Sequence, residues 1–258
     1  MINQRGCLLT SLIALLFQVQ AVNAAGLDGT SVQTGEFSSR ATVLELLGES
    51  SAQGYESLVS IDDPIQWQVY VPESYDPQKP AGLLVYISPT NSGQIPDDWK
   101  SLMEQYNLIW VAADNSGNNA PVVNRFTFAL LATVLVDRYY RLDEKRRYIS
   151  GFSGGGRVAS MVATEYAKLF RGAIYNCGVN FWDDNPAVSI DQLKTNRYVF
   201  ITGAKDFNKT DTRRVYGQYE KAGVEQIKLM VIPFMGHRNP GSRDYGKAIA
   251  WLDGETGD

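Results

Sequence analysis

Histidine is nearly absent from this 258-residue sequence, which holds a single copy, His237. One histidine and two cysteines cannot supply the closely spaced His/Cys ligands of a catalytic zinc site, so we expect no metal. The glycine-rich stretch 151–156 lacks both the lysine of a P-loop and the G-x-G-x-x-G spacing of a dinucleotide site. We therefore expect the protein to work without a cofactor.

Long runs of positive charge are also missing. The chain has 24 Lys and Arg against 28 Asp and Glu, a formal net charge of −4. Its densest basic stretch, 144–147, is short and predicts a solvated corner between a helix and a strand. Nucleic acid and anionic membrane surfaces are therefore not expected partners.

The two cysteines are too few for a disulfide framework, and the first lies in a stretch typical of a removable leader. Residues 1–24 combine a positive Arg5, a largely apolar run at 7–19 and small residues at the end, which predicts a cleaved secretory signal. That run is too short to span a bilayer comfortably, so we expect no stable membrane anchor. The prediction is an exported protein, secreted or periplasmic, with Cys177 as a small buried side chain.

The remaining sequence alternates short apolar runs with helix-length segments, which is typical of an α/β domain with a mostly parallel sheet covered by helices on both faces. The predicted strands are 66–71, 83–87, 108–113, 148–150, 173–177, 198–202 and 228–232. The predicted helices are 126–140, 155–168, 212–222 and 244–252. We expect 25–258 to form one domain, in which 25–45, rich in Gly, Ser and Thr, is a loose N-terminal segment.

One glycine-rich turn carries the strongest chemical signal. Residues 151–155 read Gly-Phe-Ser-Gly-Gly and match G-x-S-x-G, in which a serine occupies a tight turn between a strand and a helix. Only small neighbours fit this turn, which lifts the hydroxyl above the sheet beside the helix N-terminus. The strand before the turn and the helix after it favour Ser153 as a nucleophile over a plain glycine-rich turn.

A serine hydroxyl needs a neighbouring base, and His237 is the one histidine that could serve. It follows the last predicted strand, while Asp206 follows the strand at 198–202, which gives the chain order Ser, acid, His. Asp206 is therefore the predicted acid that orients the imidazole. Asp183 and Asp184, after the preceding strand, are the alternatives.

Acyl transfer also needs two N–H donors for the developing oxyanion. Gly154, directly after the serine, is the first predicted donor. The second should come from the loop after strand 83–87, where Pro89 has no N–H and Thr90 is the predicted donor. Phe181 and Trp182 form an apolar pair that we expect to contact an acyl or aryl group of the substrate, with packing as the alternative.

The stretch 142–156, Leu-Asp-Glu-Lys-Arg-Arg-Tyr-Ile-Ser-Gly-Phe-Ser-Gly-Gly-Gly, resembles the elbow region of secreted polyhydroxybutyrate-depolymerase-like and feruloyl-type esterases. Stretches 202–208 and 236–240 are similar to the acid and histidine loops of the same superfamily. The resemblance implies the α/β-hydrolase fold and hydrolysis of a small-molecule or polymeric carboxylic ester through an acyl-enzyme. Such esterases usually carry His-Gly after the third strand, where this chain has Ser88 and Pro89.

Many α/β-hydrolases carry a large cap after the strand that corresponds to 173–177. Here the interval 178–196 is short and includes Pro186, so we expect no large cap and an open site. The leading hypothesis is a secreted serine esterase. A serine peptidase of the same fold is the first alternative, although the chain leaves no room for a propeller or cap. A catalytically silent hydrolase-like binding protein is the second, and the complete set of Ser, Asp and His argues against it.

Overall fold

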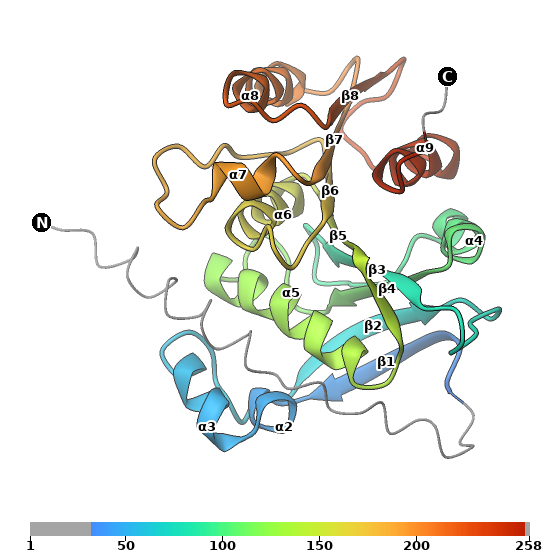
Figure 1. Ribbon diagram of the computed structural model, residues 1–258, viewed down its shortest axis with the longest axis vertical. Helices are drawn as coiled ribbons and strands as arrows, with labels where there is room; N and C mark the ends of the chain where they lie inside the picture. Colours follow the sequence, from blue (N-terminus) through green and yellow to red (C-terminus); the bar gives the residue numbers. More distant parts are fainter. Residues whose placement is uncertain (1–31, 256–258) are drawn as a thin grey trace, which may run out of the picture.

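A computed structural model describes residues 32–255, which form one eight-stranded sheet between two layers of helices (Figure 1). The strands are β1 Gly35–Ala41, β2 Ile65–Val71, β3 Ala81–Ile87, β4 Leu108–Ala113, β5 Leu142–Phe152, β6 Gly172–Asn176, β7 Arg197–Gly203 and β8 Ile227–Ile232. The helices are α2 Val43–Leu47, α3 Glu49–Ala52, α4 Asp97–Tyr106, α5 Val122–Asp137, α6 Gly154–Glu165, α7 Ile190–Leu193, α8 Lys209–Lys221 and α9 Ser242–Leu252. The predicted signal at 1–24 lies outside the described residues.

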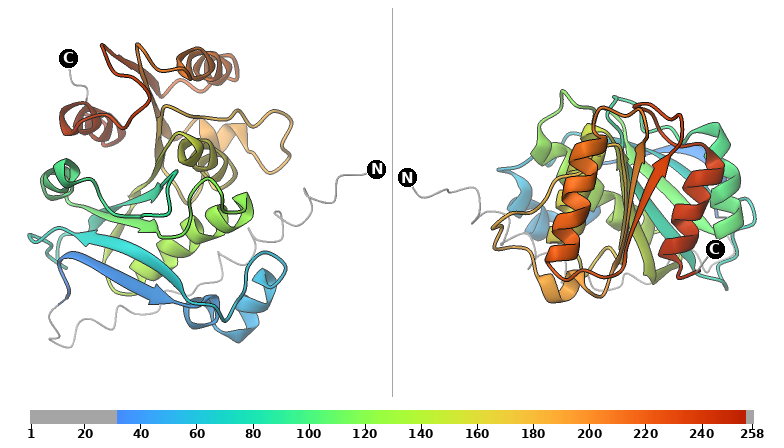
Figure 2. Two further views of the ribbon diagram at one scale, coloured as in Figure 1. Left: turned by 180° about the vertical axis from the view of Figure 1, so that it is seen from behind. Right: turned by 90° about the horizontal axis from the view of Figure 1, so that it is seen from above.

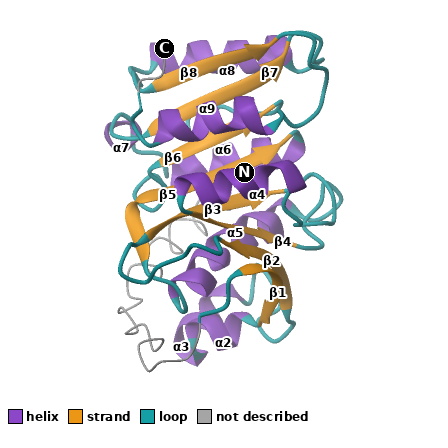
Figure 3. Ribbon diagram, turned by 90° about the vertical axis from the view of Figure 1, so that its right-hand side faces the viewer, coloured by secondary structure: helices purple, strands orange, loops and turns teal. Residues whose placement is uncertain are grey.

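The sheet follows the order β1-β2-β4-β3-β5-β6-β7-β8. Pairing is antiparallel for β1 with β2 and for β2 with β4, and parallel for every pair from β4 to β8. Because parallel strands end at the same edge, the loops after β3 to β8 gather there. Figure 3 shows the strands stacked along the molecule, with α4 and α9 in front of them.

The central strands are continuous apolar runs because both of their faces are covered. β3 and β4 are buried at every position. On one face lie α5, α6 and α8, and on the other α4 and α9, so that α8 and α9 flank the sheet when it is seen from above (Figure 2). The second face is closed by aromatic packing, in which the ring of Trp99 stacks on that of Tyr245 at 3.6 Å.

The segment 25–45 was predicted to be loose, and this prediction is wrong for 35–45, which forms β1 and the start of α2. β1 pairs with β2 along its whole length, and its residues alternate between exposed and partly buried up to Ala41. Such an edge strand carries little apolar signal because one face is left to solvent. A capping box follows directly and starts α2: Thr42 accepts from the Glu45 N–H, and the Glu45 carboxylate accepts from the Thr42 N–H.

Two further predictions need correction. The basic stretch 144–147 is not a corner but the first half of β5, which is far longer than the predicted strand at 148–150. Its arginines are held by acids at helix ends: Arg146 pairs with Asp253 after α9, and Arg147 with Asp137 at the end of α5. The helix α4 was not predicted at all, although Trp99, Leu102 and Met103 form its buried face.

No large domain covers the open edge of the sheet within the described residues. The interval 178–196 holds only the four-residue α7, as its shortness predicted. Within 32–255, no helix combines the length and the apolar character needed to cross a bilayer.

Candidate active site

The turn between β5 and α6 holds Ser153 in an unusual backbone conformation. Its φ is 54° and its ψ is −120°, a left-handed value of φ that a non-glycine residue adopts only at a cost. The turn has no room for side chains around it. A Cβ at Gly155 would collide with the carbonyl oxygen of Ile87, and one at Gly178 with that of Ser153. The motif therefore needs glycine because strand, turn and helix approach one another closely.

The structure brings together the three residues that the sequence placed on separate loops. The Nε2 atom of His237 lies 2.8 Å from the Ser153 oxygen, and its Nδ1 atom lies 2.8 Å from an Asp206 oxygen. An ionised carboxylate has no proton to donate, so Nδ1 carries the hydrogen and Nε2 is left free to accept from the serine. This arrangement can move a proton from Ser153 to His237.

Asp206 is kept charged by its surroundings. Its side chain is fully buried, at 0% exposure, whereas that of His237 is 20% exposed. Burial raises the pKa of the Asp206 carboxyl, but hydrogen bonds from the Asn208 N–H, His237 and the Thr202 hydroxyl outweigh it, and the net pKa lies below the ordinary value. The carboxylate is thus ready to stabilise an imidazolium.

Cys177 lies beside the same acid. Its thiol is fully buried, as predicted, and lies with Asp206 and His237 in a group whose ligand atoms are within 4.8 Å of one another. Burial and the neighbouring Asp206 raise the pKa of the thiol to about 12, so it stays protonated. Metal ligation needs a thiolate and a free imidazole nitrogen, whereas both nitrogens of His237 face protein groups. These donors fit hydrogen bonding rather than metal binding.

The alternative acids lie elsewhere. Asp183 and Asp184 are exposed on the loop after β6, and neither forms a hydrogen bond with His237. Asp183 instead lines a pocket beside α6. Asp206 is the carboxylate that the structure places against the imidazole.

The two predicted oxyanion donors differ in their surroundings. Gly154 is the first residue of α6, a position whose N–H has no partner within the helix. The Thr90 N–H, by contrast, already donates to the Ser88 hydroxyl at 3.1 Å. Thr90 is therefore engaged in its own turn, which the sequence did not reveal.

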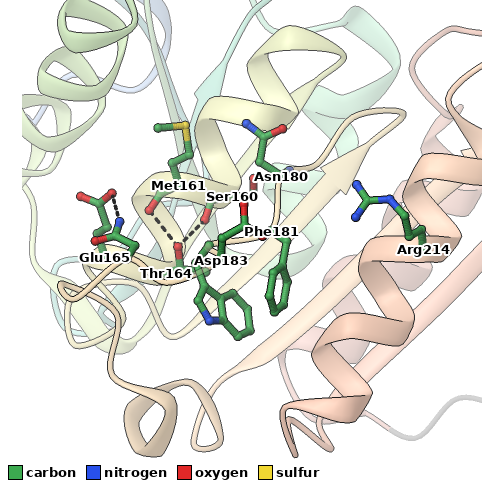
Figure 4. A pocket seen from close by; sticks show the side chains of 10 residues that line it. Ser160, Met161, Thr164, Glu165, Asn180, Phe181, Asp183 and Arg214 are labelled. Carbon is green, nitrogen blue, oxygen red and sulfur yellow. Dashed lines mark hydrogen bonds between the residues drawn. The ribbon is translucent and has the colours of Figure 1, made fainter. Parts of the chain in front are cut away.

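Phe181 and Trp182, the expected substrate contacts, pack against α8 and not against the Ser153–His237–Asp206 group. Their rings stack on each other at 4.1 Å and pack edge-on against Tyr219 of α8. They line a cavity of about 310 Å³ beside the second half of α6 (Figure 4). Ser153, Asp206 and His237 do not line this cavity. That part of α6 is roughly 10–18 Å from Ser153 along the helix axis. The Asn180 N–H, in the loop after β6, donates to the Ser160 hydroxyl, which holds this part of the loop against α6.

Two aromatic rings flank His237, and one of them, Phe207, was not singled out from the sequence. The ring of Phe207 stacks on the imidazole with centroids 4.0 Å apart, and Phe152 lies on it at 4.9 Å. Phe207 is 76% exposed, and Phe234, three residues before the histidine, is 84% exposed. The position of Phe207 directly after the predicted Asp206 was the available signal.

The structure is similar to solved hydrolases at low sequence identity. It matches a ferulic acid esterase with 15% identity over 86% of this chain and 98% of the other, at a TM-score of 0.57. A feruloyl esterase module from Clostridium thermocellum complexed with sinapinate matches with 13% identity over 87% and 90%, at 0.59. The acylaminoacyl peptidase of Pyrococcus horikoshii matches with 16% identity and a TM-score of 0.57, over 74% of this chain and 39% of the peptidase.

Sequence comparisons give no further relative: no family model and no curated protein matches the chain. The mostly parallel eight-stranded sheet and these structural matches identify the same fold. The fold that the resemblance implied is therefore confirmed: this chain has the α/β-hydrolase fold.

Proposed function

We propose that this protein is a serine hydrolase that cleaves carboxylic esters through an acyl-enzyme. The observation that carries the proposal is the hydrogen-bonded chain from Ser153 through His237 to Asp206, with both links at 2.8 Å, on a strained turn. A backbone held in that conformation is a cost that a purely structural turn would not need. The similarity to solved esterases supports the same reaction class.

In the proposed acylation step, the Ser153 oxygen attacks the ester carbonyl carbon while its proton passes to Nε2 of His237. Asp206 stabilises the imidazolium that forms, and the Gly154 N–H stabilises the negative oxygen of the tetrahedral intermediate. Collapse of that intermediate breaks the bond to the alcohol oxygen. The alcohol leaves with the proton from His237, and the acyl group remains on Ser153.

In the deacylation step, water takes the place of the alcohol. His237 accepts a proton from the water as its oxygen attacks the acyl-enzyme, and a second tetrahedral intermediate forms. Its collapse returns the proton to Ser153 and releases the acid. The partial exposure of His237, 20%, lets water reach this position.

Turnover of a chromogenic short-chain ester tests the proposal. We expect Ser153→Ala to lose about 10⁴-fold or more in kcat, because the nucleophile is removed. Circular dichroism should show an intact fold, since replacing the serine hydroxyl removes no packing. Turnover by a folded Ser153→Ala protein at the wild-type rate would overturn the proposal, and a wild-type protein without turnover would favour the silent binding protein.

A peptidase remains the second candidate because an acylaminoacyl peptidase shares the fold. This chain spans only 39% of that protein's length. Parallel assays with an alkyl ester and an N-acyl amino-acid amide of the same acyl group decide between them. A kcat/KM higher for the amide than for the ester would favour the peptidase.

We also propose that the protein is exported, on the basis of the leader pattern in 1–24. The N-terminal sequence of protein recovered from outside the cytoplasm should then begin at Ala25. Retention of the whole leader in a cytoplasmic protein would contradict the proposal.

A further inference from the structure

The proposed reaction requires a second N–H donor for the oxyanion, and neither Pro89 nor Thr90 has a free backbone N–H. The loop after β3 reads Ser88, Pro89, Thr90. Proline has no N–H, and the Thr90 N–H donates to the Ser88 hydroxyl at 3.1 Å. The Ser88 and Thr90 hydroxyls lie 2.9 Å apart and also pair with each other. One N–H, that of Gly154, would leave the oxyanion with half of the usual stabilisation.

A different loop places a side-chain amide against Gly154. Asn118 lies between β4 and α5, and its amide occupies the space in which a Cβ of Gly154 would stand: that Cβ would overlap the Oδ1 atom and lie 3.2 Å from Nδ2. Asn118 is exposed, and the one hydrogen bond that it forms within 32–255 is through its backbone. Its amide therefore lies against Gly154, the residue after Ser153, and forms no hydrogen bond within 32–255.

The loop that carries Asn118 is fixed to the loop after β3. The Asn118 N–H donates to the Pro89 carbonyl at 2.9 Å. Arg125, only 4% exposed, donates to the carbonyls of Ser116 and Ser88 at 2.9 and 3.0 Å, so one buried guanidinium joins both loops. A donor held on such a support loses little entropy when the transition state forms.

On the basis of the proposed function, we propose that the Asn118 side-chain amide is the second donor of the oxyanion hole. The last torsion of asparagine is broad and nearly two-fold, so the Nδ2 group can turn toward the carbonyl oxygen without moving the loop. A primary amide suits this role because it donates without carrying charge. A carboxylate in its place would have the same shape but would repel the oxyanion.

Steady-state kinetics of three variants test this role. We expect Asn118→Ala to lose about 10²–10³-fold in kcat, the usual effect of removing one oxyanion donor, with KM changed less than about threefold. Asn118→Asp should lose at least as much as Asn118→Ala. The control is Asn119→Ala, which removes the neighbouring exposed asparagine of the same loop and should keep kcat within about twofold. Thermal unfolding should show that all three variants are folded.

A second measurement uses a transition-state mimic. The rate of phosphonylation of Ser153 by an alkyl fluorophosphonate should fall in Asn118→Ala by a factor similar to the fall in kcat, because the phosphoryl oxygen occupies the oxyanion position. A folded Asn118→Ala protein with the kcat of Asn119→Ala, or with a raised KM alone, would overturn the inference and leave the proposed function standing. A wild-type protein that neither hydrolyses esters nor reacts with the fluorophosphonate would overturn both.

Discussion

Asp206 is the residue on which the orientation of His237 depends. It is fully buried and accepts three hydrogen bonds, from Thr202, the Asn208 N–H and the imidazole. Asp206→Asn keeps the shape but cannot stabilise the imidazolium, and its amide favours the wrong tautomer of His237. We expect kcat to fall by about 10³–10⁴-fold.

The matched controls for this change are Asp183→Asn and Asp184→Asn, which alter exposed carboxylates without a contact to the imidazole. Both should keep kcat within about twofold of wild type, since surface substitutions of this kind have small effects. A larger loss in either control than in Asp206→Asn would move the acid to the loop after β6.

Phe207 is available to a bound substrate, because it is 76% exposed while its ring is stacked on His237. We expect Phe207→Ala to raise KM for aryl esters more than for acetate esters, since an aromatic contact contributes about 0.5–1.5 kcal/mol and a severalfold change in affinity. Trp182→Ala is the control: its ring packs on Tyr219, so both ester classes should be affected alike. A selective loss in Trp182→Ala would restore it as a substrate contact.

At the scale of single residues, the sequence predicted the side chains that the proposed reaction requires. It did not predict contacts that depend on the path of a loop. Ser153 and His237 could be proposed because G-x-S-x-G needs a base and the chain has one histidine. The sequence left open whether Phe181 and Trp182 contact substrate or pack, because nothing in it shows that the Asn180 N–H donates to Ser160 of α6. Nor could the bond between Thr90 and Ser88 be read from residue types alone.

At the scale of elements, a capping box starts α2 directly after the edge strand β1. Thr42 accepts from the Glu45 N–H at 3.0 Å, and Arg138 at the end of α5 donates to the carbonyls of Glu45 and Leu46. We expect Thr42→Ala to lower the free energy of unfolding by about 1 kcal/mol, measured by urea denaturation. Thr42→Ser keeps the hydroxyl and should lose much less. Equal losses in both variants would assign the effect to the lost methyl group instead of the cap.

The elements that could be predicted are those buried on both faces. β3 and β4 are apolar at nearly every position, so their positions follow from hydrophobicity alone. β1 was missed because its exposed residues are polar and its strand character depends on pairing with β2. The Thr-x-x-Glu spacing at 42–45 was a readable sign that a helix began there.

At the scale of the whole molecule, the parallel sheet explains how three distant loops form one site. Ser153, Asp206 and His237 follow β5, β7 and β8, and the carboxyl ends of these strands meet at one edge. Their assembly was therefore predictable once the strand order was assumed. The order itself, with β3 between β4 and β5, is long-range information that local patterns do not contain.

The same edge should be open to substrate at all times. Within the described chain, 178–196 contains only the short α7, and the loops after β3 and β4 are tied together by the buried Arg125. A lid requires a segment with two arrangements of similar energy, and the hydrogen bonds of Arg125 favour a single arrangement of the loops after β3 and β4. We therefore expect no interfacial activation: the rate on a short-chain triglyceride should rise smoothly through its solubility limit.

The measurement is initial rate against substrate concentration across that limit, with a soluble nitrophenyl ester at matched concentrations as the control.

Because Arg125 joins the carbonyls of Ser116 and Ser88, Arg125→Met should loosen both loops while leaving Ser153, Asp206 and His237 unchanged. The Arg125→Met variant should therefore have a lower kcat on both substrates, and its rate should still show no jump at the solubility limit. A sharp rise for the wild type at that limit would show that a segment does cover the site, and α4 with the loop that precedes it, at 88–96, would then be the segment to immobilise first.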